Sequence, residues 1–244
     1  MSPKKIVAFI PAAGLGTRLA PLTDNCPKAL VSFLGKPMLE TVLERLSKVG
    51  IHRFIVNVHH FPEQMFAAIA ALQNRYAITI SDERNQLLDT GGGVAKAMSL
   101  LQNDEHVLFV HNVDVVVPFS YEKLILQHLQ SGSEATFAVS DRSTSRKLVF
   151  RSGALVGWIN TKTGDTRGET QNGEPFAFSG VHIVNRRVFE NTCAEPFPLI
   201  PYYLNLRTRK KMELFLHSPN GWYDLGTVQR LKNAEKAPDE SRTS

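Results

Sequence analysis

The sequence contains few cysteines and no long hydrophobic run. Its 244 residues include two cysteines, Cys26 and Cys193, which lie far apart and form no C-x-x-C pair. A disulfide framework needs several paired cysteines and an oxidising compartment, so we expect a protein of the reducing cytoplasm. No apolar run approaches the roughly 18 residues that a membrane-spanning helix needs, and no membrane partner is expected. The apolar run at residues 6–10 is also too short for the core of a signal peptide.

Concentrated charge and several common catalytic signatures are missing as well. The 28 basic residues face 23 acidic ones, and no basic stripe with interleaved aromatic residues appears, so no nucleic-acid partner is expected. The eight histidines form neither H-E-x-x-H nor another zinc spacing, and no G-x-S-x-G segment marks a covalent hydrolase. The hydrophobic share of 43% is that of an ordinary globular protein. We expect one domain over residues 1–235 and a polar tail over residues 236–244.

Apolar strands alternate with helical patterns through the first half of the chain. We expect strands at residues 6–10, 54–58, 77–80 and 107–110, and helices at residues 37–49, 62–72 and 93–101. This alternation is typical of βαβ units, in which helices cover both faces of a parallel sheet. The second half is expected to add antiparallel strands at residues 135–139, 148–150, 155–159 and 176–184. The predicted fold class is therefore α/β, with a Rossmann-like, mostly parallel mixed sheet and ligands at the carboxyl ends of its strands.

The loop after the first expected strand is rich in small residues. Ala12, Ala13, Gly14 and Gly16 precede Thr17 there, and their small side chains let backbone N–H groups approach an anionic polyphosphate. A Rossmann fingerprint needs a third glycine where this chain has a leucine, and a Walker loop needs a Gly-Lys-Ser/Thr that is absent. Taken alone, the glycines would fit a structural strand-to-helix turn, but two cations close by favour a phosphate site.

These two cations are Arg18 and Lys28. Arg18 carries a planar and permanently charged guanidinium, whose fork matches the oxygens of a phosphate group. The ammonium group of Lys28, which follows a proline, is expected within reach of the same pocket. There it would stabilise the charge that grows on departing pyrophosphate.

The small-residue loop is the first part of a longer pattern that resembles a known family. Residues 12–19, followed by segments 21–23, 27–28 and 35–38, are similar to the signature of the nucleoside-diphosphate-sugar pyrophosphorylases, and the resemblance extends to about Leu231. It implies the nucleotide-diphospho-sugar transferase fold. It also implies an enzyme that joins a nucleoside triphosphate to a sugar 1-phosphate with Mg²⁺ and releases pyrophosphate, with Arg18 and Lys28 in catalytic roles.

A second glycine cluster, Thr90-Gly91-Gly92-Gly93, narrows the resemblance. It looks most like the N-acetylmuramate-1-phosphate uridylyltransferases and the mannose-1-phosphate guanylyltransferase-like members. In these relatives the cluster lies beside the nucleobase, so the resemblance assigns Gly91 and Gly92 to nucleotide binding and favours UTP or GTP. The alternative, a flexible helix N-terminus, accounts for one glycine better than for three in a row.

Two aspartates are candidate magnesium ligands. Asp114 follows the expected strand at 107–110, and an aspartate at the carboxyl end of a parallel strand is well placed to hold Mg²⁺. Asp224 lies in a run that resembles the second aspartate motif of the family, which implies a carboxylate pair for the metal and a catalytic role for Asp114. The family carries a glycine where this chain has Val113, and we expect the valine to narrow the cleft near the sugar.

The acceptor half of the site matches the family only in part. The resemblance places Asn112, Ser179 and Gly180 against the bound sugar phosphate. The Glu-Lys-Pro segment, whose lysine holds the sugar phosphate in many relatives, is missing here, and Arg146 is expected to replace that lysine. Two alternatives stay open: transfer to a non-sugar phosphate such as phosphocholine, and a nucleotide- or sugar-binding regulatory module without catalysis.

Overall fold

The structure is a computed structural model in which residues 5–237 are described. Residues 238–244 of the expected polar tail lie outside the described residues. Lys236, which we assigned to that tail, is instead the last residue of helix α6 (Val228–Lys236). Within residues 5–237, no helix combines the length and the apolar character that crossing a bilayer requires.

One large mixed sheet runs through the described chain. Its strands are β1 (Lys5–Ile10), β4 (Arg53–Val58), β5 (Ala77–Asp82), β6 (Glu105–His111), β8 (Ala135–Ser140), β9 (Arg146–Arg151), β10 (Ala154–Asn160), β11 (Thr166–Gly168), β12 (Glu174–Asn185) and β13 (Met212–Leu216). Within residues 5–237, nine of these ten strands follow the order β11-β10-β13-β8-β12-β6-β1-β4-β5, and the tenth, β9, pairs with β10 and β12. The strands from β6 to β5 pair in parallel, as do β8 and β13, whereas β12 pairs antiparallel with β6 and β8.

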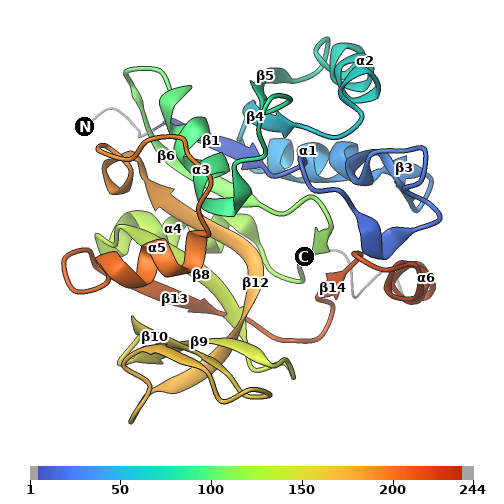
Figure 1. The fold of residues 1–244 in the computed structure, drawn as a ribbon. Coiled ribbons are helices and arrows are strands. Elements are labelled where there is room, and N and C mark those ends of the chain that lie inside the picture. Colours follow the sequence, from blue (N-terminus) through green and yellow to red (C-terminus); the bar gives the residue numbers. More distant parts are fainter. Residues whose placement is uncertain (1–4, 238–244) are drawn as a thin grey trace.

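Helices cover both faces of this sheet (Figure 1). They are α1 (Met38–Lys48), α2 (Pro62–Leu72), α3 (Asp89–Ser99), α4 (Tyr121–Ser131), α5 (Leu199–Leu206) and α6. The side chains of β1 alternate between the two faces. Ala8 and Ile10 belong to a hydrophobic cluster with α1, α2, α4 and α6, whereas Val7 and Phe9 belong to a cluster with α3 and α5. Burial on both faces explains why this strand is an unbroken apolar run, and the predicted Rossmann-like α/β fold is confirmed.

Most element boundaries predicted from the sequence lie within two residues of the observed ones. The exception is α3, which begins at Asp89 rather than at residue 93, so the three glycines lie inside its first turn. Helices α4 and α5 were not among the predicted elements, although α4 has clear end signals. The hydroxyl of Ser120 accepts a hydrogen bond from the backbone of Lys123, and Gly132 closes the helix in the left-handed conformation.

The strand register brings distant segments together at one edge of the sheet. Ile10 pairs with Val56 and Phe9 pairs with Val110, so the residues that follow β1, β4 and β6 lie side by side. Two further strands, β7 (Val115–Val116) and β14 (Tyr223–Asp224), form a separate antiparallel pair at this edge, and β2 (Ser32–Phe33) pairs with β3 (Lys36–Pro37). This edge carries the candidate site.

Candidate active site

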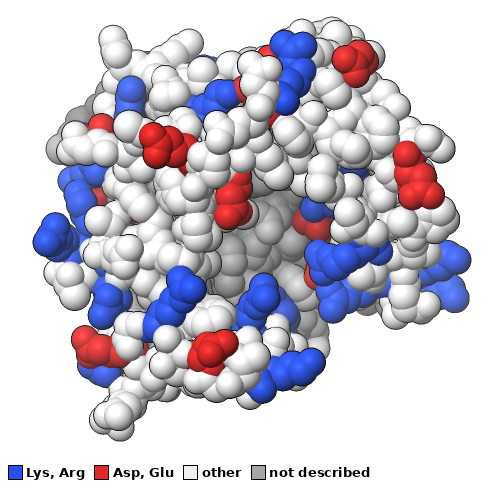
Figure 2. All heavy atoms as spheres, viewed as in Figure 1, with Lys and Arg blue, Asp and Glu red and all other residues white. Residues whose placement is uncertain are grey.

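Two adjoining cavities open at the carboxyl ends of the parallel strands. Their volumes are about 910 Å³ and 300 Å³, and both are lined by Arg18, Asn112 and Asp114. The smaller cavity lies between the loop after β1 and the start of α3, and the larger one reaches Asp224 and the segment 142–146. Lys and Arg side chains gather along the lower and right-hand rim of the hollow that Figure 2 shows in this face. The charge of the rim suits anionic ligands.

The loop after β1 is fixed by a buried asparagine that sequence reasoning missed. The Asn57 side-chain oxygen accepts hydrogen bonds from the backbone N–H groups of Ala12 at 2.6 Å and Ala13 at 3.1 Å. Its amide nitrogen donates to the Glu83 carboxyl at 2.9 Å, and burial raises the pKa of Glu83. Both amides therefore already have an internal partner, and the expectation that they bind phosphate stays a prediction.

The remaining small residues of the loop divide into two groups. Gly14 lines the smaller cavity, as does the Ala13 side chain. Gly16 instead adopts a left-handed conformation with φ of 68°, and a Cβ there would lie 3.0 Å from both Lys28 and Thr23, so this glycine allows a tight turn. Thr17 is exposed and lines neither cavity. Among the residues assigned to the nucleotide in this loop, Ala13 and Gly14 are the two that line the smaller cavity.

The three predicted catalytic residues come together where the cavities meet. The Lys28 ammonium donates a hydrogen bond to the Asp114 carboxylate at 3.0 Å, and both side chains are largely buried, with 18% and 10% exposed. Arg18 is exposed and lines both cavities. A cation therefore already faces the carboxylate that was predicted to bind metal, and the pair is shielded from water, which strengthens its electrostatic interaction.

Asp224 lies next to Asp114 because β14 pairs with β7. A Cβ built on Gly226 would lie 2.7 Å from an Asp224 oxygen, 3.2 Å from an Asp114 oxygen and 3.0 Å from an Arg18 nitrogen, so all three groups converge on one point. Asp224 is also ion-paired with Arg230. Mg²⁺ is ordinarily held by one or two carboxylates, with phosphates and waters as its other ligands. The two aspartates fit such an ion, and within residues 5–237 no group of three potential metal-ligating side chains is found.

The predicted acceptor residues are only partly confirmed as cavity residues. Asn112, Gly180 and Arg146 line the larger cavity. Ser179 does not, because its side chain is fully buried and its hydroxyl donates to Nε2 of His217 at 2.7 Å. Burial lowers the pKa of His217, which keeps the ring neutral and able to accept that proton. The Ser179 side chain therefore points away from the larger cavity, and the assignment of this residue to the sugar phosphate stays a prediction.

The two glycines assigned to the nucleobase face another part of the chain. A Cβ on Gly91 would lie 2.3 Å from the Phe197 ring, and one on Gly92 would lie 2.0 Å from the Glu195 carbonyl oxygen. The Gly91 N–H also donates to the Phe197 carbonyl oxygen at 2.9 Å. The two glycines thus make room for the segment before α5, and their assignment to the nucleobase stays a prediction. Of the three glycines in this cluster, Gly93 lines the smaller cavity.

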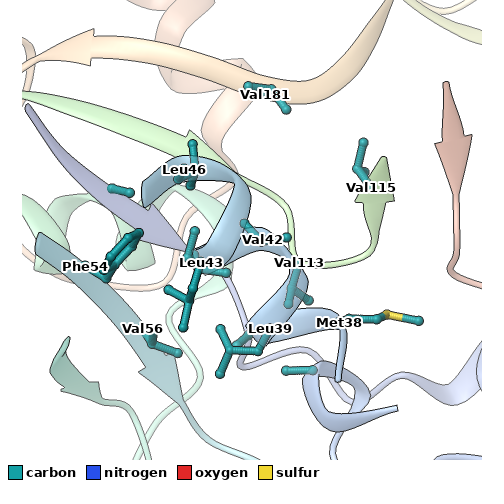
Figure 3. Packing of buried hydrophobic residues seen from close by; sticks show 14 of the residues in the cluster. Met38, Leu39, Val42, Leu43, Leu46, Phe54, Val56, Val113, Val115 and Val181 are labelled. Atoms are coloured by element: carbon teal, nitrogen blue, oxygen red, sulfur yellow. The ribbon is translucent and has the colours of Figure 1, made fainter. Parts of the chain in front are cut away.

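The Val113 side chain also lies elsewhere than predicted. It is 1% exposed and belongs to the hydrophobic cluster that contains Leu39 and Val42 of α1 (Figure 3). The valine therefore does not narrow the cleft. Other residues of the larger cavity were missed from the sequence, above all Arg142, which carries no recognisable motif.

Comparison with known proteins gives a consistent result. The family model described as nucleotidyl transferase matches residues 7–148. The N-acetylmuramate alpha-1-phosphate uridylyltransferase of Caulobacter vibrioides is 33% identical over 224 residues, which cover 84% of this chain and 86% of that protein. The mannose-1-phosphate guanyltransferase beta-A of Xenopus laevis is 35% identical over 224 residues, and the match covers 90% of this chain but only 61% of the longer relative. Among solved structures, a UDP-glucose pyrophosphorylase of Acinetobacter baumannii shares the fold with a TM-score of 0.74 at 18% identity, over 93% of this chain and 91% of that chain.

Proposed function

The chain belongs to the nucleotidyl transferase family, among the sugar-1-phosphate nucleotidyltransferases, and we propose that it transfers a uridylyl group from UTP to N-acetylmuramate 1-phosphate. The products would be a UDP-sugar and pyrophosphate. The uridylyltransferase of Caulobacter vibrioides supports this choice, because the match covers most of both chains. The second candidate is guanylyl transfer from GTP to mannose 1-phosphate, which the similarity to the Xenopus guanyltransferase favours.

The observation that carries the proposal is the convergence of two carboxylates and two cations between the cavities. Asp114 and Asp224 face one point together with Arg18, and Lys28 donates to Asp114. Mg²⁺ held by the two aspartates would neutralise phosphate charge and draw the two substrates together. Nucleotidyl transfer needs little covalent chemistry from the protein, so positioning and charge stabilisation account for most of its catalysis.

The residues divide between the two substrates by cavity. The triphosphate would lie in the smaller cavity, where Lys28 and Arg18 hold the β- and γ-phosphates. The acceptor would lie in the larger cavity and attack the α-phosphorus in line through an oxygen of its 1-phosphate. A new bond forms between this oxygen and the α-phosphorus as the bond to the leaving pyrophosphate breaks. The two cations then stabilise the charge that the pyrophosphate carries away.

A pyrophosphate-release screen tests this proposal. Four nucleoside triphosphates are crossed with a panel of sugar 1-phosphates and with phosphocholine, each with and without Mg²⁺. Release that requires UTP, N-acetylmuramate 1-phosphate and Mg²⁺ together is the expected result. Release with phosphocholine alone would contradict the sugar acceptor. No release with any pair, despite nucleotide binding by calorimetry, would point to a binding module without catalysis.

A further inference from the structure

Arg142 is held face-on against Trp222 in the wall of the larger cavity. Its guanidinium carbon lies 3.7 Å from the centroid of the Trp222 ring. One of its terminal nitrogens donates a hydrogen bond to the carbonyl oxygen of Phe178 at 2.6 Å. Trp222 is fixed in turn, because its indole nitrogen donates to the carbonyl oxygen of Ser179 at 3.0 Å. The planar fork of the arginine therefore has a set orientation before any ligand binds.

An irregularity in β12 positions both of these carbonyl acceptors. Between two paired positions, residues 179–181 of β12 stand opposite the single residue Ala138 of β8. Such a bulge interrupts the hydrogen-bond ladder and re-aims the backbone beside it. Arg142 and Trp222 bind to carbonyl groups at this bulge, and Gly180 at its centre has a φ of 79°. The bulge thus ties both side chains to the cavity wall.

Among the described residues, the positive charge of Arg142 has no carboxylate partner. The two aspartates of the cavity are paired with other cations, Asp114 with Lys28 and Asp224 with Arg230. Within residues 5–237 no carboxylate lies at ion-pair distance from Arg142, and its Nε is buried without a hydrogen-bond partner. Burial lowers the pKa of Arg142, although nearby Asp224 acts in the opposite direction, and a guanidinium remains charged at neutral pH. A partly buried cation with unused N–H donors is suited to an anionic ligand.

We propose that Arg142, oriented by Trp222, binds the 1-phosphate of the acceptor sugar. This inference rests on the proposed function. Arg142 lines the larger cavity together with Asp224, whereas Lys28 lines the smaller one and Arg18 lines both. Arg142 therefore belongs to the acceptor half of the site. It occupies the role left open by the missing lysine of the Glu-Lys-Pro segment.

Arg146, the replacement expected from the sequence, is less suited to this role. It is the exposed first residue of β9, and no hydrogen bond or ion pair of its side chain is found within residues 5–237. A free side chain loses conformational freedom when it binds, whereas the stack on Trp222 has already restricted Arg142. We therefore expect Arg146 to contribute less to acceptor binding than Arg142.

The decisive experiment measures acceptor binding without turnover. Calorimetric titrations use N-acetylmuramate 1-phosphate and N-acetylglucosamine 1-phosphate, which differ by the lactyl ether that carries the carboxylate. They are run on the full chain and on the variants Arg142→Gln, Arg142→Lys and Arg146→Gln. Arg151→Gln is the matched control, because Arg151 is exposed and is ion-paired with Glu169 away from both cavities. Thermal unfolding of every variant shows whether the fold is kept.

We expect Arg142→Gln to lower the affinity of the chain for both acceptors by about tenfold to a hundredfold, the typical effect of losing charge-assisted hydrogen bonds. Arg142→Lys should recover part of this loss, Arg146→Gln should cost less, and UTP affinity should not change. A loss confined to the muramate would show that the guanidinium binds the carboxylate and overturn the proposal. Unchanged acceptor binding, an equal loss of UTP binding, or no acceptor binding by the native chain would also overturn it. If the native chain binds acceptor through Arg142 but releases no pyrophosphate, only the proposed transfer fails.

Discussion

Replacement of Asn57 by leucine tests whether the loop after β1 depends on one internal acceptor. Asn57 is 5% exposed, and its side-chain oxygen accepts hydrogen bonds from the backbone N–H groups of Ala12 and Ala13 at 2.6 and 3.1 Å. It also donates to Glu83 at 2.9 Å. Leucine has a similar volume but no polar atoms. Asn57→Leu therefore leaves two buried amide groups and one buried carboxyl group without this partner.

The size of the effect follows from these lost hydrogen bonds. A buried donor without a partner costs about 1–3 kcal/mol, so the two amides together cost roughly 2–6 kcal/mol of unfolding free energy. Native domains are stable by only about 5–15 kcal/mol, and a loss of this size is easily measured. Because the same loop lines the smaller cavity, we also expect the KM for the nucleotide to rise.

Urea unfolding and pyrophosphate-release kinetics on the same preparations check both parts. The matched control is Asn160→Leu, since Asn160 lines neither cavity and its side chain accepts one backbone N–H at 3.1 Å in an exposed turn. Surface substitutions of this kind usually change the free energy of unfolding by no more than about 0.5 kcal/mol. An Asn57→Leu variant that unfolds like the control and keeps a native KM for nucleotide would refute the argument.

Three further predictions follow from the site and its surroundings. Gly92→Ala should destabilise the fold by about 1–3 kcal/mol, since its Cβ would lie 2.0 Å from a backbone carbonyl oxygen, whereas Gly93→Ala meets no atom closer than 3.4 Å and should cost less by urea unfolding. Asp114→Asn and Asp224→Asn should each slow pyrophosphate release by about 10²–10³-fold, and near-native rates would reject the metal assignment. Burial raises the pKa of Glu83, so the native state holds the Glu83 proton more tightly than the unfolded state does. The contribution of this proton to the free energy of unfolding therefore falls as pH rises from the usual glutamate range through the raised pKa. Glu83→Gln should flatten that part of the curve of unfolding free energy against pH.

Local sequence patterns predicted the elements of the fold well. The unbroken apolar run of β1 and the punctuation of α1 by a proline and a glycine are local signals, and the structure follows them closely. Arg18 and Asp114 follow expected strands, which placed them at the carboxyl edge of the sheet. Asp224 was assigned through the resemblance to the family, and its approach to Asp114 depends on the pairing of β14 with β7, which the sequence did not predict.

Contacts between segments far apart in the chain could not be predicted in this way. Asn57 acts on the loop after β1 only because β1 and β4 are neighbours in register. Gly91 and Gly92 of α3 are required by a segment about a hundred residues later in the chain. The residues next to these glycines in the sequence give no sign of the contact with Phe197. The inward direction of the Ser179 hydroxyl depends on the bulge in β12, which alternation along a strand does not reveal. In each of these cases tertiary packing decides the position of a residue.

The alternative of an inactive binding module drew its support from two departures from the family pattern. One was Val113, but its side chain packs against α1 in the hydrophobic core and leaves the cleft unobstructed. The other was the missing lysine for the sugar phosphate. The larger cavity contains a pre-oriented guanidinium, Arg142, whose charge is not neutralised by a carboxylate within the described chain. With a cation available for the acceptor and the four catalytic candidates in place, neither departure favours loss of activity, and catalysis is the reading that the site supports.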